Sequence, residues 1–370
     1  MRNLIPFIAL FVFLAFVVGV NIYLSKRFTW YFGISHISRV YVLFALGTVF
    51  MIGGLMAFTN SVSSFGRIVY LLASISMGFT LYLIMSVILV DLVQFLVKAR
   101  PVIYGMTAIS IASVVTLLGI WHSYNLQITA IEIPIKGLSN EMRAMHISDV
   151  HLGHFRGKNF IQKIVDSTKR LDIDAVFLTG DLFDGKIKLN SDVISPFEQL
   201  EVPIYFVEGN HDGYSDPERI KQELRESGII VLENEVVNWE EFQIIGLDHM
   251  PADSQAFDMH ATLEHATIKD ILPTLEIDRG KPSILLHHSP VGIKYASEHG
   301  IDLYLAGHTH AGQLFPINLI AKLMFPYNRG LYEHNGTNIY VSQGTGTFGP
   351  PLRVGTRSEL AVVILKPARR

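Results

Sequence analysis

The first third of the chain contains four long stretches almost free of charge, and they limit its fold more than any other feature. They are residues 4–24, 40–58, 68–97 and 101–121. Asp91 is the one charged residue among them. Each stretch has the roughly 20 apolar residues that cross the hydrocarbon core of a bilayer. Backbone polar groups find no water there, so a spanning segment of this kind must be helical. The sequence therefore predicts a transmembrane region of four helices within residues 1–125.

Two features of these stretches have more than one interpretation. The first stretch follows Arg2 and resembles a signal peptide, but three further spans and the lack of a small-residue cleavage site favour a retained helix. Asp91 is a carboxylate inside a span, and such groups are often functional. It also lies near the end of its span and close to Lys98, so an interfacial or helix-pairing role is equally compatible.

The short loops between the spans carry unequal numbers of basic residues. The loops after the first and third spans contain Lys26, Arg27 and Arg39, and Lys98 and Arg100. The opposite side has only Arg2 and Arg67. Because Lys and Arg accumulate on the cytoplasmic side of a membrane, we expect a multi-pass protein of the cell membrane. The residues after Trp121 are then extracytoplasmic.

Charge and cysteine content exclude several kinds of site. The chain has no cysteine, so it forms no disulfides and offers no thiolate ligands. Any metal site must use His, Asp, Glu or Asn. The net charge of −3 provides no basic surface, which argues against nucleic acid as a partner. The sequence does not indicate an oligomeric state.

Residues 128–370 have the alternating pattern of an α/β domain, in which short β-branched runs alternate with amphipathic stretches. The expected strands are residues 128–135, 142–149, 175–181, 203–210, 229–234, 242–248, 283–289, 302–308, 338–344 and 359–366. The expected helices are residues 158–171, 191–200, 216–227, 266–275 and 291–300.

Polar side chains that can bind a metal follow five of these strands. They are Asp149 and His151; Asp181 and Asp184; Asn210, His211 and Asp212; His287 and His288; and His308 and His310. The carboxyl ends of strands in an α/β sheet converge on one crevice. Burying so many carboxylates and imidazoles without a cation would be very unfavourable. The pattern therefore predicts a metal site, whereas one H-x-H pair alone would favour ordinary surface or core histidines.

The ordered set D-x-H, GD-x-x-D, GNHD, H-x-P and GH-x-H resembles the calcineurin-like metallophosphoesterases over about residues 128–370. Residues 329–365 resemble the membrane-linked bacterial branch of that superfamily. The resemblance implies a four-layer α/β/β/α sandwich, preceded here by the transmembrane region, and two divalent metal cations. One cation would be held by Asp149, His151 and His310, the other by Asn210, His288 and His308, with Asp181 bridging them.

Neighbouring residues have less direct roles in this assignment. The spacing to Pro290 selects His288 over His287 as the ligand. His154 remains open between a substrate contact and a surface position. Orienting or structural roles are expected for His146, Asp184, His287 and Asp212.

The resemblance implies hydrolysis of a phosphate ester. Two divalent cations lower the pKa of a bridging water, and the resulting hydroxide would attack phosphorus. His211, oriented by Asp184, would stabilise or protonate the leaving oxygen; a ligand role for His211 is disfavoured because the ligand set is already full. Ligation by His, Asp and Asn without sulfur suits Mn, Fe, Zn or Co. Manganese is expected, because it is a common activator in the resembling family.

The substrate is less constrained. A catalytic domain tied to membrane spans meets lipid-linked phosphates at high local concentration, so a lipid is one substrate class. In residues 318–332, Leu323, Met324 and Phe325 beside Lys322 form either an interfacial segment or a buried helix of the sandwich. Two other functions stay open. A transporter with an appended enzyme is disfavoured by the near absence of charged and helix-breaking residues in the first, second and fourth spans. A sensor without turnover is disfavoured by His211.

Overall fold

The computed structural model describes residues 5–184, 191–214, 216–255 and 266–368. Leu4, the first residue of the first predicted span, lies outside this set. Contacts between Cα atoms divide the chain into two units, one up to Ile120 and the other from Trp121 onward. Each unit is described by itself.

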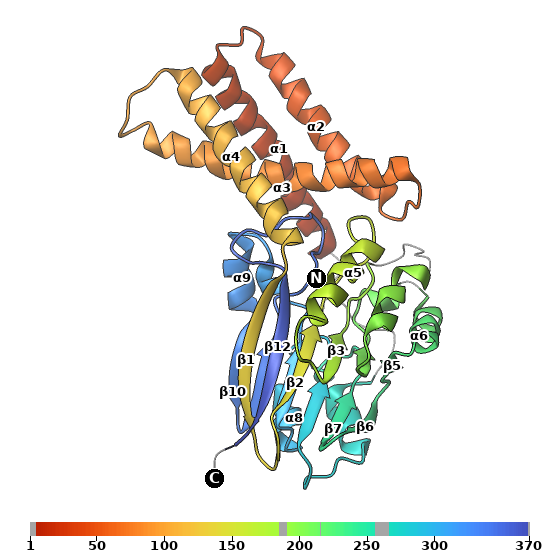
Figure 1. The fold of residues 1–370 in the computed structure, drawn as a ribbon. Helices are drawn as coiled ribbons and strands as arrows, with labels where there is room; N and C mark the ends of the chain where they lie inside the picture. Colours follow the sequence, from red (N-terminus) through yellow and green to blue (C-terminus); the bar gives the residue numbers. More distant parts are fainter. Residues whose placement is uncertain (1–4, 185–190, 215, 256–265, 369–370) are drawn as a thin grey trace. The chain divides into compact units, whose positions relative to one another are not determined.

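The first unit is built from the four predicted apolar helices. They are α1 (Ile5–Phe32), α2 (Ile37–Phe58), α3 (Ser64–Val93) and α4 (Pro101–Tyr124), the last turn of which belongs to the second unit (Figure 1). All four are long and apolar enough to cross a membrane. α1 continues past its predicted end, so Lys26 and Arg27 lie in its last turns and not in a loop. Long basic side chains can extend their charge along a helix towards water, so they do not force a helix to end.

Asp91 of α3 is bound by three side chains of α1. The hydroxyls of Tyr23 and Tyr31 donate to its two carboxylate oxygens at 2.7 and 2.9 Å, and the guanidinium of Arg27 pairs with it. The guanidinium also lies 4.7 Å from the ring centre of Trp30. The carboxylate thus joins α1 to α3, which matches the helix-pairing interpretation.

The second unit contains two six-stranded sheets, ordered β1-β12-β2-β3-β4-β5 and β10-β11-β9-β8-β7-β6. The first sheet comprises β1 (Gln127–Ile135), β12 (Glu359–Pro367), β2 (Met142–Ile147), β3 (Ala175–Thr179), β4 (Ile204–Val207) and β5 (Ile230–Val231). The second comprises β10 (Gly330–His334), β11 (Thr337–Val341), β9 (Leu303–Ala306), β8 (Ser283–Leu286), β7 (Phe242–Gly246) and β6 (Glu235–Trp239). β1 and β12 run side by side in parallel (Figure 1).

Strand side chains alternate between cores on the two faces of each sheet. On β3, Val176 and Leu178 join the core shared with α5 (Lys158–Thr168) and α6 (Pro217–Glu226), whereas Phe177 packs between the sheets. A third core lies between the second sheet and its covering helices, α7 (Ile268–Ile271) and α8 (Ile293–Glu298). This is the predicted four-layer α/β/β/α sandwich.

Three elements differ from the sequence-based expectation. β6 and β10 were not predicted; both are antiparallel edge strands with half-exposed residues, so their apolar pattern is weak. Residues 191–200, predicted as a helix, contain two short 3₁₀ segments, the second of which (Ser195–Gln199) has Pro196 near its start. Proline lacks the backbone N–H that a continuous α-helix requires.

Candidate metal centre

Five strand ends supply the polar side chains of a buried cluster. Asp149, Asp181, His288 and His308 each stand two residues beyond the end of β2, β3, β8 and β9. Asn210 stands three residues beyond the end of β4. The first sheet thus contributes three of these side chains and the second sheet two. Interatomic distances given below link Asp149, His308, His288 and Asp181.

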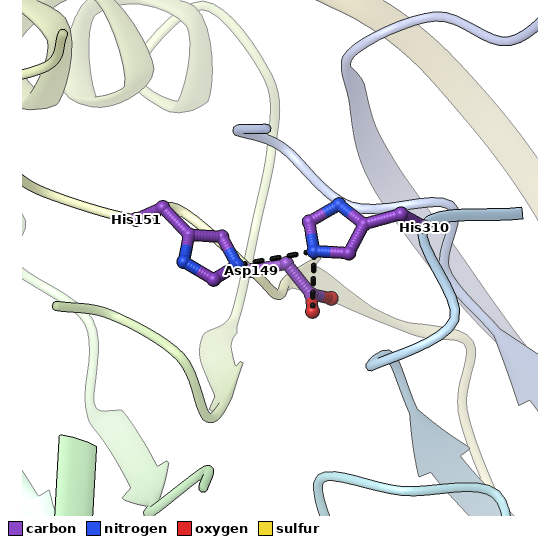
Figure 2. Close-up of side chains that lie close together, drawn as sticks. All are labelled: Asp149, His151 and His310. Atoms are coloured by element: carbon purple, nitrogen blue, oxygen red, sulfur yellow. Dashed lines mark hydrogen bonds and ion pairs between the residues drawn. The ribbon is translucent and has the colours of Figure 1, made fainter. Parts of the chain in front are cut away.

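One group consists of Asp149, His151 and His310, all buried (Figure 2). The Nε2 atoms of the two histidines lie 3.0 Å apart, and Nε2 of His310 lies 3.4 Å from Oδ1 of Asp149. Potential ligand atoms from all three lie within 4.8 Å of one another. Two imidazoles and a carboxylate that converge in this way could hold one cation.

A second group surrounds Asp181. Its Oδ2 lies 3.2 Å from Nε2 of His288 and 3.6 Å from Nε2 of His151, so the carboxylate stands between the two groups. Nδ1 of His308 lies 3.2 Å from Nε2 of His288. The Oδ1 atom of Asn210 is buried and has no hydrogen-bond partner among the described residues. A buried unpaired amide oxygen and two converging imidazoles are donors that a second cation could use.

Neighbouring groups fix which atom of each side chain faces the cluster. Nδ1 of His288 lies 2.8 Å from the carbonyl of Thr179, which leaves Nε2 directed at Asp181. Asp149 accepts hydrogen bonds from the Ser148 hydroxyl at 2.6 Å and from the His308 backbone N–H at 3.0 Å. Such partners are what orients metal ligands in proteins.

Asp184 and Asp212 take different positions around the cluster. Oδ1 of Asp184 lies 3.4 Å from Nδ1 of His151 and 3.5 Å from Nδ1 of His211. Asp212 accepts backbone hydrogen bonds from Phe183 and Gly209, both at 2.9 Å. Asp212 therefore ties two site loops together, whereas Asp184 connects a candidate ligand to His211.

The backbone of the site is held in an uncommon conformation. Positive φ angles occur at five candidate ligands: Asp149 (54°), His151 (51°), Asp181 (50°), His308 (70°) and His310 (47°). Such conformations are unfavourable for residues with a side chain and concentrate at functional sites. The surrounding hydrogen bonds must hold these residues in place.

Two glycines allow the loops to approach the acidic ligands. A Cβ atom on Gly209 would lie 2.2 Å from Oδ1 of Asp181, and one on Gly307 would lie 1.8 Å from Oγ of Ser148. Both distances are shorter than any tolerable contact, so only glycine fits at these positions.

The buried charges shift each other's proton affinity. Burial alone would lower the pKa of His288, but the negative charge of the neighbouring Asp181 carboxylate raises this pKa to about 10. Burial raises the pKa of Asp149 and lowers the pKa of His310 far below its usual value. Two divalent cations would neutralise the buried carboxylates directly, and ligands of nitrogen and oxygen without sulfur suit such ions.

One histidine beside the cluster, His249, was not predicted from the sequence. It is 5 % exposed, and its ring centre lies 5.7 Å from that of His288 and 6.1 Å from that of His308. Neither ring nitrogen has a hydrogen-bond partner among the described residues. His249 stands three residues beyond the end of β7, just as Asn210 follows β4, and this position was the available signal.

Three other histidines lie outside the cluster or at its edge. His146 is fully buried, with Nε2 2.7 Å from the Thr179 hydroxyl. His287 is also buried, with Nδ1 2.7 Å from the carbonyl of Ser289. His154 is half-buried in the loop after β2.

Aromatic side chains border the cluster. The ring of Phe348, which is exposed, has its centre 5.2 Å from that of His211 and 6.2 Å from that of His151. The ring of Phe325 has its centre 6.1 Å from that of His308. The approach to the cluster is therefore partly apolar.

Comparison with known proteins shows the family. The sequence model described as calcineurin-like phosphoesterase matches residues 142–312. An uncharacterized metallophosphoesterase of Helicobacter pylori (strain J99) is 36 % identical over 235 residues, which cover 62 % of this chain and 61 % of that protein. A transmembrane protein with metallophosphoesterase domain of Danio rerio is 34 % identical over 265 residues, covering 65 % of this chain and 58 % of that protein.

The chain therefore spans less than two thirds of the length of these two relatives. An uncharacterized metallophosphoesterase of Aquifex aeolicus (strain VF5) is 32 % identical over 264 residues, covering 68 % of this chain and 98 % of that protein. Because nearly the whole of that relative is matched at 32 % identity, the chain belongs to the calcineurin-like metallophosphoesterase family.

Proposed function

We propose that this chain is a membrane-anchored hydrolase of phosphate esters that uses two divalent cations. The observation that supports this most is the convergence of buried carboxylates and imidazoles that follow four strands of the two sheets, β2, β3, β8 and β9. In this proposal Asp149, His151 and His310 would hold one cation, Asn210, His288 and His308 would hold the other, and Asp181 would serve both.

When bound, the two cations supply positive charge to the phosphoryl oxygens and lower the pKa of a coordinated water. The ligands of nitrogen and oxygen are compatible with Mn, Fe, Zn or Co. We take manganese as the first metal to test, with the others as alternatives.

His211 acts on the leaving group in this proposal. Asp184 lies 3.5 Å from its Nδ1 and holds the ring in orientation, so the other nitrogen is left to face the substrate. That nitrogen donates a hydrogen bond or a proton to the oxygen that leaves phosphorus. The charge that develops on this oxygen is thereby stabilised.

His249 binds a non-reacting phosphoryl oxygen in this proposal. Its ring is buried beside His288 and His308, and both of its nitrogens lack a hydrogen-bond partner among the described residues. An unpaired buried polar group is unfavourable, and a phosphoryl oxygen would satisfy it.

We further propose that the substrate is lipid-linked. Phe348 and Phe325 give the approach to the cluster an apolar character, and four helices tie the chain to a membrane. In this arrangement the chain resides in the cell membrane. The distribution of basic residues between the loops favours an extracytoplasmic catalytic unit.

The test is hydrolysis of a chromogenic phosphodiester and a phosphomonoester by the full chain in detergent, with and without added Mn. We expect Mn-dependent release of the chromophore from at least one of them. Asp181→Asn should lower the rate at least about 100-fold, because it removes the charge of the proposed shared ligand. Loss of a residue that only orients a ligand would lower activity by about 10–100-fold.

Asp166→Asn makes the same chemical change at an exposed position of α5 and should leave the rate unchanged. Turnover that survives in Asp181→Asn, or that is absent from the unsubstituted chain with each of the four metals, would refute the proposed function.

A further inference from the structure

α9 (Ile317–Met324) turns its apolar side chains outward, the reverse of a helix on the water-exposed surface of a soluble domain. Its buried or half-buried positions carry Asn318 and Ala321. Its outward positions carry apolar side chains whose exposed fractions run from 44 % to 88 %. They are Ile317, Leu319, Ile320, Leu323 and Met324. A helix at a water-facing surface buries its apolar face and exposes its polar one.

Phe315, just before the helix, is also exposed, and together these six side chains are called the α9 patch. Exposed apolar side chains scattered singly need no explanation, whereas a contiguous apolar surface marks a place of interaction. The sequence left open whether this segment is buried or interfacial. The exposure of Leu323 and Met324 excludes a buried helix within the second unit.

Hydrogen bonds within the second unit connect the α9 patch to the point where the chain leaves α4. The N–H of Phe315 donates to the carbonyl of Val354 at 2.8 Å. Four residues later, the hydroxyl of Ser358 donates to the carbonyl of Ser123 at 2.8 Å. Ser123 belongs to the last turn of α4, which is itself one of the four membrane-length helices. A helix that crosses the membrane ends at the membrane surface, so a short loop links the patch to that surface.

Basic side chains accompany the apolar ones. Lys322 is exposed on α9 itself. Arg329 and Arg357 are exposed and line a cavity of about 620 Å³ together with His122 of the last α4 turn and Gly355. A Cβ atom on Gly355 would lie 2.8 Å from the side chain of Asn318, so this cavity adjoins α9. An apolar helix face bordered by Lys and Arg is the composition of segments that lie in the interfacial layer of a bilayer.

We propose that the α9 patch lies in the interfacial layer of the membrane that the four helices span. Its apolar side chains then contact the upper acyl chains, while Lys322, Arg329 and Arg357 face the phosphates of anionic lipid head groups. Basic side chains favour this occupant over an apolar protein surface, because a protein partner would have to bury or match these charges.

This placement has a consequence for how substrate reaches the site, and that consequence alone rests on the proposed hydrolysis. Phe325 directly follows the patch, and its ring contacts that of His308. A lipid-linked phosphate would therefore reach the cluster along α9 with its apolar part still in the bilayer.

The absence of cysteine allows a direct test on the full chain. Leu323 is chosen because its side chain is 88 % exposed. The Leu323→Cys variant of the full chain is labelled with an environment-sensitive fluorophore and reconstituted into phosphatidylcholine vesicles that contain phosphatidylglycerol. We expect a blue-shifted emission that is quenched when nitroxide-labelled lipids are included. Ile230→Cys is the matched control, because Ile230 is an exposed apolar residue on β5, at the opposite edge of the sheet from β1.

Ile230→Cys should keep a water-like emission without quenching by lipid. The proposal is overturned if the Leu323 probe stays water-like, or if both probes are quenched equally. A blue shift of the Leu323 emission without quenching by nitroxide lipids also overturns it. In that case the patch is covered by protein, either another part of this chain or a second copy of it. No substrate is present in this measurement, so a failure of the proposed hydrolysis leaves its result unaffected.

Discussion

His211 and its neighbour Asn210 come from one loop but have different surroundings. The amide oxygen of Asn210 is buried without a partner among the described residues, whereas His211 is half-buried with its Nδ1 near Asp184. The backbone N–H of His211 donates to Oδ1 of Asp181 at 2.9 Å. A substitution of the His211 side chain therefore leaves this hydrogen bond in place, which makes its chemical role separable from the structure of the loop.

His211→Ala should lower turnover by about 10²–10⁴-fold, the range for a lost general acid. The metal content, measured by elemental analysis of the purified chain, should stay close to that of the parent. His36→Ala, an exposed histidine before α2, serves as the control for both quantities. Loss of both metals from His211→Ala would refute its catalytic role.

His249→Phe keeps a ring of similar size against His288 but removes both nitrogens. We expect kcat/KM to fall by about 10–100-fold, because a hydrogen bond to a charged group contributes about 1.5–3 kcal/mol. His249→Gln, which retains a donor, should recover part of this loss. If His249→Phe instead releases a metal, the residue is a ligand and the proposed contact with the phosphoryl group is wrong.

At the scale of elements, the loop before β12 is organised by one buried arginine. Arg353 is fully buried, and its Nη2 donates to the carbonyls of Gly344 and Gly346 at 3.0 and 2.7 Å. The same atom lies 3.3 Å from Nδ1 of His310. Burial lowers the pKa of Arg353 to about 9, so the guanidinium still carries its charge at neutral pH. One side chain thus connects the loop after β11 to a candidate ligand from the loop after β9.

The pairing of α1 with α3 through Asp91 can be tested by a double-mutant cycle. Arg27→Ala and Asp91→Ala should each lower the thermal stability of the chain in detergent, because each leaves a charge without its partner in apolar surroundings. The double substitution should lose less stability than the sum of the two single losses, with a coupling energy of about 1–3 kcal/mol. Additive losses would show that the two residues stabilise the helices independently.

At the scale of the whole molecule, the chain combines four membrane-length helices with a sandwich whose site uses both sheets. The two sheets must be packed against each other before the candidate ligands can meet, because β8 and β9 supply the histidines opposite the acids of β2 and β3. Asp149 and His310 therefore belong to one cluster even though 161 positions separate them in the sequence.

The orientation of the chain in the membrane gives a prediction at this scale. An alkaline phosphatase reporter, which is active only outside the cytoplasm, should be active when fused at the C-terminus and inactive when fused after Lys98. A fluorescent protein that folds in the cytoplasm should give the opposite pattern. An active phosphatase at Lys98 together with an inactive one at the C-terminus would reverse the predicted topology.

Much of this architecture was predictable from local pattern. The four apolar runs, the strands buried on both faces and the motifs at strand ends each involve a short segment whose period or composition is visible in the sequence. β6 and β10 were missed because an edge strand is stabilised by its neighbour and needs little apolar periodicity of its own. His249 was missed because it belongs to none of the recognised motifs.

The sequence by itself determined the number of membrane-length helices, the α/β class and the chemical types available to a metal site. Those properties depend on hydrophobicity, periodicity and side-chain chemistry, which the chain carries wherever it folds. Only the tertiary structure decided that His249 joins the cluster, that Arg353 stands behind His310, and that α9 turns its apolar face outward. These depend on which segments distant in sequence become neighbours, since exposure and proximity are properties of packed elements and not of a residue alone.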